Sequence, residues 1–152
     1  MSFSFIRIFL IVVSVVLSFE IRRLDIIAQR QRKTFNAISK VLSENEFDAL
    51  MDGCKASDKV HVVEYAKSKC KPCAKVAPKY EEMSNNYGDR VLFYKVDADT
   101  SPDVKVLMKT QGIRSVPTFH IWLKGEKVDV IQGARIDEVI DCVESCLRPT
   151  KE

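Results

Sequence analysis

The 152-residue sequence predicts one α/β domain behind a separate N-terminal extension. From Phe35 onward, short apolar runs alternate with segments of helical periodicity, a pattern typical of a sheet covered by helices. With 46% hydrophobic and 30% charged residues, a chain of this length buries a substantial core. We therefore expect a central β-sheet flanked by helices, in the order β-α-β-α-β-α-β-β-α.

The expected strands are short runs rich in β-branched and aromatic residues. They span Ala37–Leu42, Val60–Ala66, Val91–Val96, Thr118–Leu123 and Lys127–Ile131. Gly125 lies in the segment LKGEK between the last two runs. A glycine at that place predicts a hairpin turn.

The expected helices are marked by capping residues and by apolar residues at helical spacing. They span Asn45–Asp52, about Cys73–Asn86, Pro102 to about Gly112, and Ile136–Leu147. Ser43 and Glu46 fit a capping box at the start of the first helix. Pro78 falls inside the second helix and predicts a kink there.

The extension begins with a short apolar run, IFLIVVSVVLSF, at residues 8–19. Its length suits a signal-peptide core better than a membrane span, which needs about 20 apolar residues. We interpret residues 1–18 as a signal peptide or signal anchor, residues 19–35 as a basic helical linker, and residues 149–152 as a tail.

Three destinations follow from the extension. We favour the secretory pathway or secretion. Basic residues downstream of the apolar run also fit membrane attachment through residues 3–19. Residues 21–40 are Arg-rich and poor in acids, which fits an organelle transit segment.

The net charge of +3 is unevenly distributed. Residues 1–40 hold 7 Lys or Arg against 2 acids, whereas residues 41–152 hold 17 against 19. The domain is therefore slightly acidic and offers no broad basic stripe, so we expect no nucleic-acid partner.

The segment SKCKPCAKVAP, Ser68–Pro78, places two cysteines where a strand leads into a helix. A helix N-terminus lowers the pKa of a thiol below its free value of about 8.5, and the thiolate is the nucleophile in disulfide exchange. Cys70 lies at that terminus, while Cys73 lies one turn inside and suits a shielded, resolving thiol. Lys69 and Lys71 flank Cys70 and favour its thiolate.

Two other interpretations of the cysteine pair are weaker. A zinc site needs two more ligands, and none of the remaining His and Cys residues forms a second CxxC or an HxxxH: His61, His120, Cys54, Cys142 and Cys146. We therefore expect no metal and no other cofactor. A purely structural disulfide across so short a loop removes little entropy from the unfolded chain.

Residues 36–148 resemble the thioredoxin family. The matching segments are VVEYA, CKPC followed by Pro78, KVDAD, GIRSVPT, the hairpin KGEK, and Gly133 in QGA. The resemblance implies a thioredoxin fold with a mixed sheet, and a protein-disulfide oxidoreductase. It also implies partners of two kinds, protein substrates with disulfides and a reductase or other dithiol donor.

The resemblance assigns roles around the cysteine pair. It implies that Cys70 attacks the substrate, that Cys73 resolves the mixed disulfide, and that the two form a redox-active disulfide. Pro117 matches the family's cis-proline, whose loop lies against the active site. A cis bond there leaves the backbone of Val116 free to pair with an extended substrate.

Glu64 matches the position of the family's buried aspartate, and Lys95 matches the lysine partner that some members have. Such a carboxylate takes a proton from Cys73 as that thiol attacks. The sequence departs from the family at Lys69, where a tryptophan is usual, and at Lys71, where a glycine is usual. We place both lysines at the substrate-binding surface, together with Pro72, Val116 and Pro117.

The other cysteines and the histidines are expected to be structural. Cys142 and Cys146 share a face of the last helix and are expected to pack on the core, with Cys142 at its edge. Cys54 falls in the polar stretch DGCKASDK and is expected to be exposed. His61 and His120 lie in strands and are expected to be hydrogen-bonded.

One alternative function stays open on the sequence alone. The missing tryptophan and the extension also fit a redox-weak interaction module of thioredoxin fold, recruited to a membrane or secretory assembly.

Overall fold

The computed structural model describes residues 38–148. The interpretations of residues 1–18, 19–35 and 149–152 fall outside this range. Within it, no helix combines the length and the apolar character that a membrane crossing requires.

Five strands form one mixed sheet in the order β1-β3-β2-β4-β5. They are β1 (Ser39–Val41), β2 (Val60–Ala66), β3 (Val91–Asp97), β4 (Thr118–Leu123) and β5 (Glu126–Gln132). β3 pairs in parallel with β1 and β2, β4 pairs antiparallel with β2, and β5 pairs antiparallel with β4. The expected strands are confirmed, and β2 lies at the centre of the sheet.

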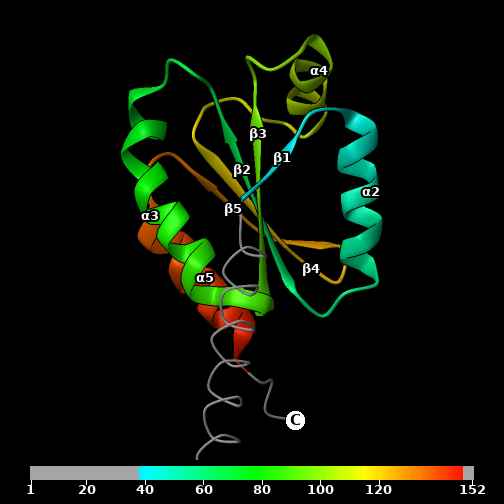
Figure 1. Cartoon of the computed structure of the whole chain (residues 1–152), viewed down its shortest axis with the longest axis vertical. Coiled ribbons are helices and arrows are strands. Elements are labelled where there is room, and N and C mark those ends of the chain that lie inside the picture. The colour runs from blue at the N-terminus through cyan, green and yellow to red at the C-terminus, as the bar shows by residue number, and fades with distance from the viewer. Residues whose placement is uncertain (1–37, 149–152) are drawn as a thin grey trace, which may run out of the picture. The chain divides into compact units, whose positions relative to one another are not determined.

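Four α-helices cover the sheet, two on each face (Figure 1). They are α2 (Glu44–Lys55), α3 (Lys71–Tyr87), α4 (Pro102–Thr110) and α5 (Ile136–Leu147), and a 3-10 turn, η1 (Gly88–Arg90), follows α3. α3 and α5 enclose one apolar core against the sheet, and α2 and α4 enclose the other. Residues 38–148 therefore have the expected order of elements.

Side chains fix where the helices start. Ser43 Oγ accepts a hydrogen bond from the Glu46 amide at 3.2 Å, and the Glu46 carboxylate accepts one from the Leu42 amide at 2.7 Å. Ser43 is thus confirmed as the N-cap of α2, but the capping box is only half formed, because Glu46 bonds the amide of Leu42 rather than that of Ser43. At the start of α4, Ser101 Oγ accepts from the Val104 amide at 3.2 Å.

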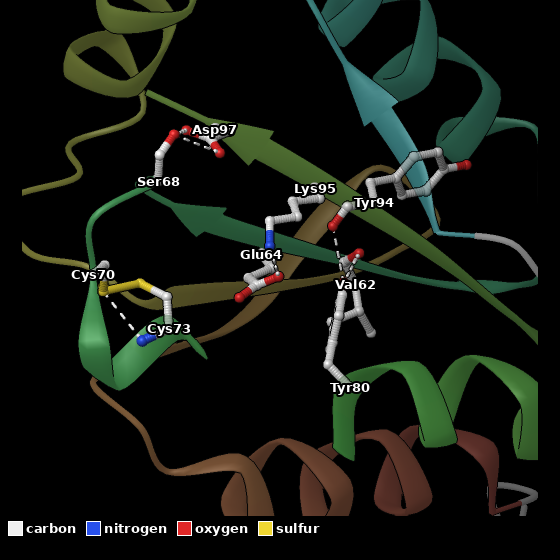
Figure 2. Close-up of polar contacts among 9 residues, drawn as sticks. All are labelled: Val62, Glu64, Ser68, Cys70, Cys73, Tyr80, Tyr94, Lys95 and Asp97. Carbon is white, nitrogen blue, oxygen red and sulfur yellow. Dashed lines mark hydrogen bonds and ion pairs between the residues drawn. A yellow bond between two sulfur atoms is a disulfide. The ribbon is translucent and has the colours of Figure 1, made fainter. Parts of the chain in front are cut away.

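Tyr80 fastens α3 to the sheet. Its ring is buried between Phe93 and Phe119. Its hydroxyl lies 3.0 Å from the Val62 carbonyl oxygen and 2.9 Å from that of Tyr94, so its single hydrogen has an acceptor on each of two neighbouring strands (Figure 2). Tyr80 lies in the middle of α3, so this contact sets how the helix crosses β2 and β3.

Cys54 is fully buried, so the expectation of an exposed thiol was wrong. α2 continues to Lys55 rather than ending at Asp52. Cys54 follows Phe47 by seven residues and therefore lies on the same inner face of the helix. Its sulfur accepts a hydrogen bond from the Gly125 amide at 3.4 Å, which joins the last turn of α2 to the β4–β5 hairpin.

The histidines are buried, but the expectation that they are hydrogen-bonded is not met at three of their ring nitrogens. Both ring nitrogens of His61, and Nδ1 of His120, have no hydrogen-bond partner among the described residues. The rings instead pack against tyrosines, His61 on Tyr94 at 5.7 Å and His120 on Tyr65 at 4.7 Å between centroids. Aromatic contact takes the place of the predicted hydrogen bonds.

Cys142 and Cys146 are half-buried and pack against the α3–α5 core, as expected for structural residues. Burial raises the pKa of the Cys142 thiol to about 12, with further contributions from Cys146 and Asp129. A thiol with so high a pKa is almost fully protonated at neutral pH and reacts slowly.

Candidate active site

The two cysteines of CKPC are joined as a disulfide at the start of α3 (Figure 2). Cys70 is the N-cap residue of the helix, and its sulfur accepts a hydrogen bond from the Cys73 amide at 3.1 Å. Cys70 is half-buried, whereas Cys73 is only 4% exposed. An incoming disulfide therefore meets Cys70 first.

The loop before Cys70 is held by two aspartates at the C-terminal end of β3, Asp97 as its last residue and Asp99 just after it. The Ser68 amide donates to Asp99 Oδ2 at 3.0 Å, and the Ser68 hydroxyl lies 3.5 Å from the Asp97 carboxylate. The Ala98 amide donates to the Ala66 carbonyl at 3.0 Å, so the ends of β2 and β3 are joined directly. The sequence analysis gave Asp97 and Asp99 no role, although two acids directly after a strand next to β2 were a usable signal.

The backbone of Val116 lies next to the disulfide. The Val116 carbonyl oxygen lies 3.8 Å from Cys70 Sγ. The peptide bond between Val116 and Pro117 is cis, and Pro117 is buried. Pro117 is held in turn by its own carbonyl, which accepts from the Gly133 amide at 2.7 Å. The chain therefore brings together two segments that lie 46 residues apart in the sequence.

Glu64 is buried on the face of β2 that α3 covers. It follows Val62 by two residues and so shares that residue's face of the sheet. Its side chain is 1% exposed, and Lys95 Nζ lies 3.5 Å from its Oε2 (Figure 2). The second oxygen, Oε1, has no hydrogen-bond partner among residues 38–148.

Burial and charge act on Glu64 in opposite directions. Loss of solvent raises the pKa of the carboxyl, the Lys95 ammonium lowers it, and Asp97 adds a smaller upward contribution. The effect of burial is the largest, so the pKa of Glu64 is raised. Glu64 therefore holds a proton at higher pH than an ordinary carboxyl group does.

The remaining predicted site residues lie on the surface around the disulfide. Lys69, Lys71 and Pro72 are exposed, so they are available to a partner. Lys67 and Lys75 are exposed as well and add to the positive charge of this surface. Among residues 38–148, no group of three His, Cys, Asp or Glu side chains is placed to hold a metal ion.

The structure groups six of the predicted site residues into two sets, the disulfide with the Val116–Pro117 backbone and the buried Glu64–Lys95 pair, and leaves three on the exposed surface. The first set contains Cys70, Cys73, Val116 and Pro117, and the second contains Glu64 and Lys95. The roles of these residues in the reaction stay predictions.

Comparisons with known proteins agree with this geometry. The thioredoxin family model matches residues 38–145. Thioredoxin H-type of Chlamydomonas reinhardtii is 36% identical over 97 residues, 64% of this chain and 83% of that protein. Thioredoxin F, chloroplastic, of Oryza sativa subsp. japonica is 41% identical over 90 residues, 59% of this chain, and the match spans 46% of that protein's length.

Solved structures show the same likeness. The short form of thioredoxin F from spinach chloroplast superposes with a TM-score of 0.63 at 31% identity, covering 72% of this chain and 92% of that one. The family match extends over most of the chain and includes both cysteines. The chain therefore belongs to the thioredoxin family, and it is a thiol–disulfide oxidoreductase with Cys70 and Cys73 as its close cysteine pair.

Proposed function

We propose that Cys70 is the attacking thiol and Cys73 the resolving thiol in the reduction of protein disulfides. The Cys70 thiolate attacks one sulfur of the partner disulfide, forms a mixed disulfide, and expels the other partner sulfur as a thiolate. The Cys73 thiolate then attacks Cys70 Sγ, which releases the second partner sulfur and leaves the Cys70–Cys73 disulfide. Two electrons pass to the partner, and the reverse sequence oxidises a partner dithiol.

The difference in exposure between the two sulfurs carries this assignment. Cys70 is half-buried at the N-cap of α3, while Cys73 is 4% exposed behind it. A thiolate at a helix N-terminus is stabilised by the free backbone amides and by the helix dipole. The Cys73 amide already donates to Cys70 Sγ at 3.1 Å.

Glu64 takes the proton of Cys73 in the second step. A buried thiol ionises poorly, so it needs a base close by at the moment of attack. The raised pKa of Glu64 makes the carboxylate a better proton acceptor near neutral pH. Lys95, at 3.5 Å, is a positioning residue that favours the ionised carboxylate between cycles.

The partner segment lies in an extended conformation against Val116. The carbonyl of Val116 is 3.8 Å from Cys70 Sγ, so an amide of the partner that pairs with this strand end places its cysteine at the attacking sulfur. Pro117 and Pro72 are rigid neighbours of this docking strand. The exposed side chains of Lys69 and Lys71 favour partners with acidic residues near their cysteines.

Two assays test the proposal. In an insulin-reduction assay with dithiothreitol, the native protein is expected to accelerate precipitation and Cys70→Ala to abolish the acceleration. Cys73→Ser is expected to accumulate mixed disulfides on non-reducing gels, whereas Cys70→Ser is not. Equal trapping by the two serine variants would show that the roles are wrongly assigned. An inactive native protein would instead favour the redox-weak interaction module.

A reductase or other dithiol donor returns electrons to the Cys70–Cys73 disulfide. One similar structure is a complex of ferredoxin:thioredoxin reductase and thioredoxin f2, with 31% identity, a TM-score of 0.62 and 72% of this chain covered. That likeness supports a reductase partner for this chain. Reduction of the purified protein by dihydrolipoamide or by a reductase system, followed by thiol titration, identifies the class of donor.

Residues 1–37 direct the chain into a membrane-bounded compartment. The apolar run supports the secretory pathway or a membrane anchor, and the chloroplastic names of several relatives support an organelle. Residues 1–37 fused to a fluorescent protein distinguish these destinations by microscopy. A diffuse signal identical to that of the unfused protein would contradict targeting by this segment.

A further inference from the structure

A pocket of about 430 Å³ lies at the C-terminal end of α4, beside the loop that leads to Val116. Its apolar lining comes from Ala98, Met108 and Ile113, and its charged lining from Lys105, Lys109 and Arg114. We call it the α4 pocket. None of the functions assigned above uses it.

The floor of the pocket is fixed by the way α4 ends. Gly112, with φ of 72°, follows the helix, and its amide donates to the Lys109 carbonyl at 3.0 Å. The Ile113 amide donates to the Met108 carbonyl at 2.9 Å. These two bonds form a Schellman motif. Met108 belongs to the apolar core under α2 and α4, and Ile113 packs against that core. The apolar floor is therefore preformed.

The rim of the pocket carries unbalanced positive charge. The side chains of Lys105, Lys109 and Arg114 are all exposed. None of them forms an ion pair with another residue in the range 38–148. The lining contains no acidic residue. An occupant that combines an apolar side chain with negative charge matches this surface, and a cationic occupant does not.

Two segments that line the pocket, at Arg114 and at Ala98, continue toward the cysteine pair. On one side, Arg114 precedes Val116 by two residues, and the Val116 carbonyl lies 3.8 Å from Cys70 Sγ. On the other side, the Ala98 amide donates to Ala66 at 3.0 Å, at the end of the strand that leads to Cys70. An extended chain rises about 3.3 Å per residue, so a partner residue two or three positions from the attacked cysteine reaches the pocket.

From these observations we infer that the α4 pocket is a specificity subsite of the exchange reaction. It receives an apolar side chain of the protein partner that is flanked by acidic residues and lies two or three positions from the reacting cysteine. This inference rests on the proposed docking of the partner at Val116. The apolar floor selects the side chain, and the three cations select its neighbours.

The test uses synthetic peptides whose single cysteine carries glutathione as a mixed disulfide. An acidic peptide has leucine flanked by glutamates two or three residues from the cysteine, before it in one set and after it in another. A basic peptide replaces the glutamates with lysines, and a third peptide replaces the leucine of the acidic one with glycine. The second-order rate constant with the reduced full-length protein is measured for each, at low and at high salt.

The native protein is expected to prefer the acidic to the basic peptide by about tenfold at low salt, and by less at high salt. The variant Lys105→Gln with Lys109→Gln is expected to reduce that ratio about threefold. The matched control removes the same charge at the opposite end of the sheet, through Lys55→Gln with Lys59→Gln, and is expected to keep the native ratio. Replacing leucine by glycine is expected to slow the native protein with the acidic peptide in at least one set.

Several outcomes would overturn the subsite. An equal loss of preference in the control variant would mean that net charge, not the pocket, selects the partner. Equal rates for the leucine and glycine peptides in both sets would remove the apolar floor from recognition. Inhibition by citrate that matches that of a cysteine-free acidic peptide would make the pocket a site for small anions.

The reaction of the native protein with 2-hydroxyethyl disulfide separates this inference from the proposed function. That disulfide is small and uncharged, so it reports on the cysteine pair alone. A native protein that reduces it but shows no peptide preference loses the subsite and keeps its function. A native protein that fails to reduce it loses both.

Discussion

Glu64 is the residue at which folding and function oppose each other. Its carboxyl group is 1% exposed and gains one ion pair, with Lys95, in exchange for its water. Burial outweighs that contact, so the pKa is raised and the ionised form is less stable in the folded protein than in the unfolded chain. A base held ready for Cys73 therefore destabilises the fold at neutral pH.

Replacing Glu64 with Gln is expected to stabilise the oxidised protein at pH 8. The folded protein binds the Glu64 proton more tightly than the unfolded chain, so stability falls as pH rises from the unfolded pKa through the raised folded pKa. The gain is expected to be about 1.4 kcal/mol for each unit by which the pKa is raised, and to vanish near pH 4. Urea unfolding of both proteins at the two pH values measures it. An equal difference at both pH values would mean that side-chain shape, not ionisation, sets the effect.

Lys69 and Lys71 are expected to make the disulfide a stronger oxidant. Positive charge beside Cys70 stabilises its thiolate, and whatever stabilises the reduced pair favours reduction. The double variant Lys69→Trp with Lys71→Gly is expected to be more reducing by at most about tenfold in the glutathione equilibrium, because exposed charges are screened. The difference is expected to shrink at high salt. An unchanged equilibrium at low salt would leave the helix N-terminus as the dominant influence on the thiolate.

At the scale of elements, the hairpin and α2 hold each other in place. The Gly125 amide donates to Cys54 Sγ, and the space beside Gly125 is filled by Lys55. A Cβ at Gly125 would lie 2.3 Å from Lys55 Cγ and 3.3 Å from Lys55 Cα, at a φ of 80°. The hairpin glycine therefore serves both the turn and the helix behind it.

Gly125→Ala is expected to lower the free energy of unfolding by about 1–2 kcal/mol from backbone strain alone, and further if Lys55 is displaced. Gly53 provides the matched control, since it lies inside α2 with nothing within 4 Å of an added Cβ. Gly53→Ala is expected to raise the free energy of unfolding by about 0.5–1 kcal/mol. Chemical denaturation of the two variants checks the pair, and similar effects of the same sign would contradict this account.

The elements themselves were predictable because their signals are local. Capping residues, a hairpin glycine and apolar periodicity mark α2, the β4–β5 turn and α5 within a few residues each. The end of α2 was missed because DGCKASDK is polar in composition, and only packing shows that Cys54 faces inward. The predicted hydrogen bonds of His61 failed for the same reason, since its partner is the ring of Tyr94 on another strand.

The parts of the site that are formed by residues close together in the sequence could be predicted from it, whereas the contacts between distant residues could not. The CKPC motif at a helix N-terminus was enough to predict the thiol chemistry. The place of Val116 beside the active site was predicted only from the family resemblance. Its approach to Cys70 joins residues 46 apart. The α4 pocket carries no signal of its own, because Lys105 and Lys109 look like an ordinary solvated helix face until Ile113 and Ala98 are placed beside them.

Over the whole molecule, acid stability depends on two histidines that fold uncharged. Burial lowers the pKa of His120 to about 4, with a contribution from Lys127, and burial and Lys59 lower that of His61. Between the unfolded pKa of about 6.5 and the lowered folded values, the unfolded chain binds more protons. Stability is therefore lost as pH falls through that window.

His120→Phe is expected to flatten the stability profile between pH 6.5 and pH 4. Phenylalanine keeps the aromatic contact with Tyr65 and has no proton to bind, so the variant is expected to lose less stability on acidification than the native protein. Unfolding free energies at several pH values measure the two slopes. Parallel slopes would assign the acid sensitivity to other groups, with His61→Phe as the next variant to compare.

The central position of β2 determines which part of the molecule opens last. All seven of its residues are buried, and it is paired along both edges, with β3 and with β4. Amide protons in such a strand exchange with solvent only when the domain opens as a unit. This strand carries Glu64 and leads to Cys70. We therefore expect the cysteine pair to be anchored next to the part of the fold whose amide protons exchange most slowly with solvent. Conformational adjustment during disulfide exchange therefore falls to the partner, whose cysteine must lie in a segment that is free to extend.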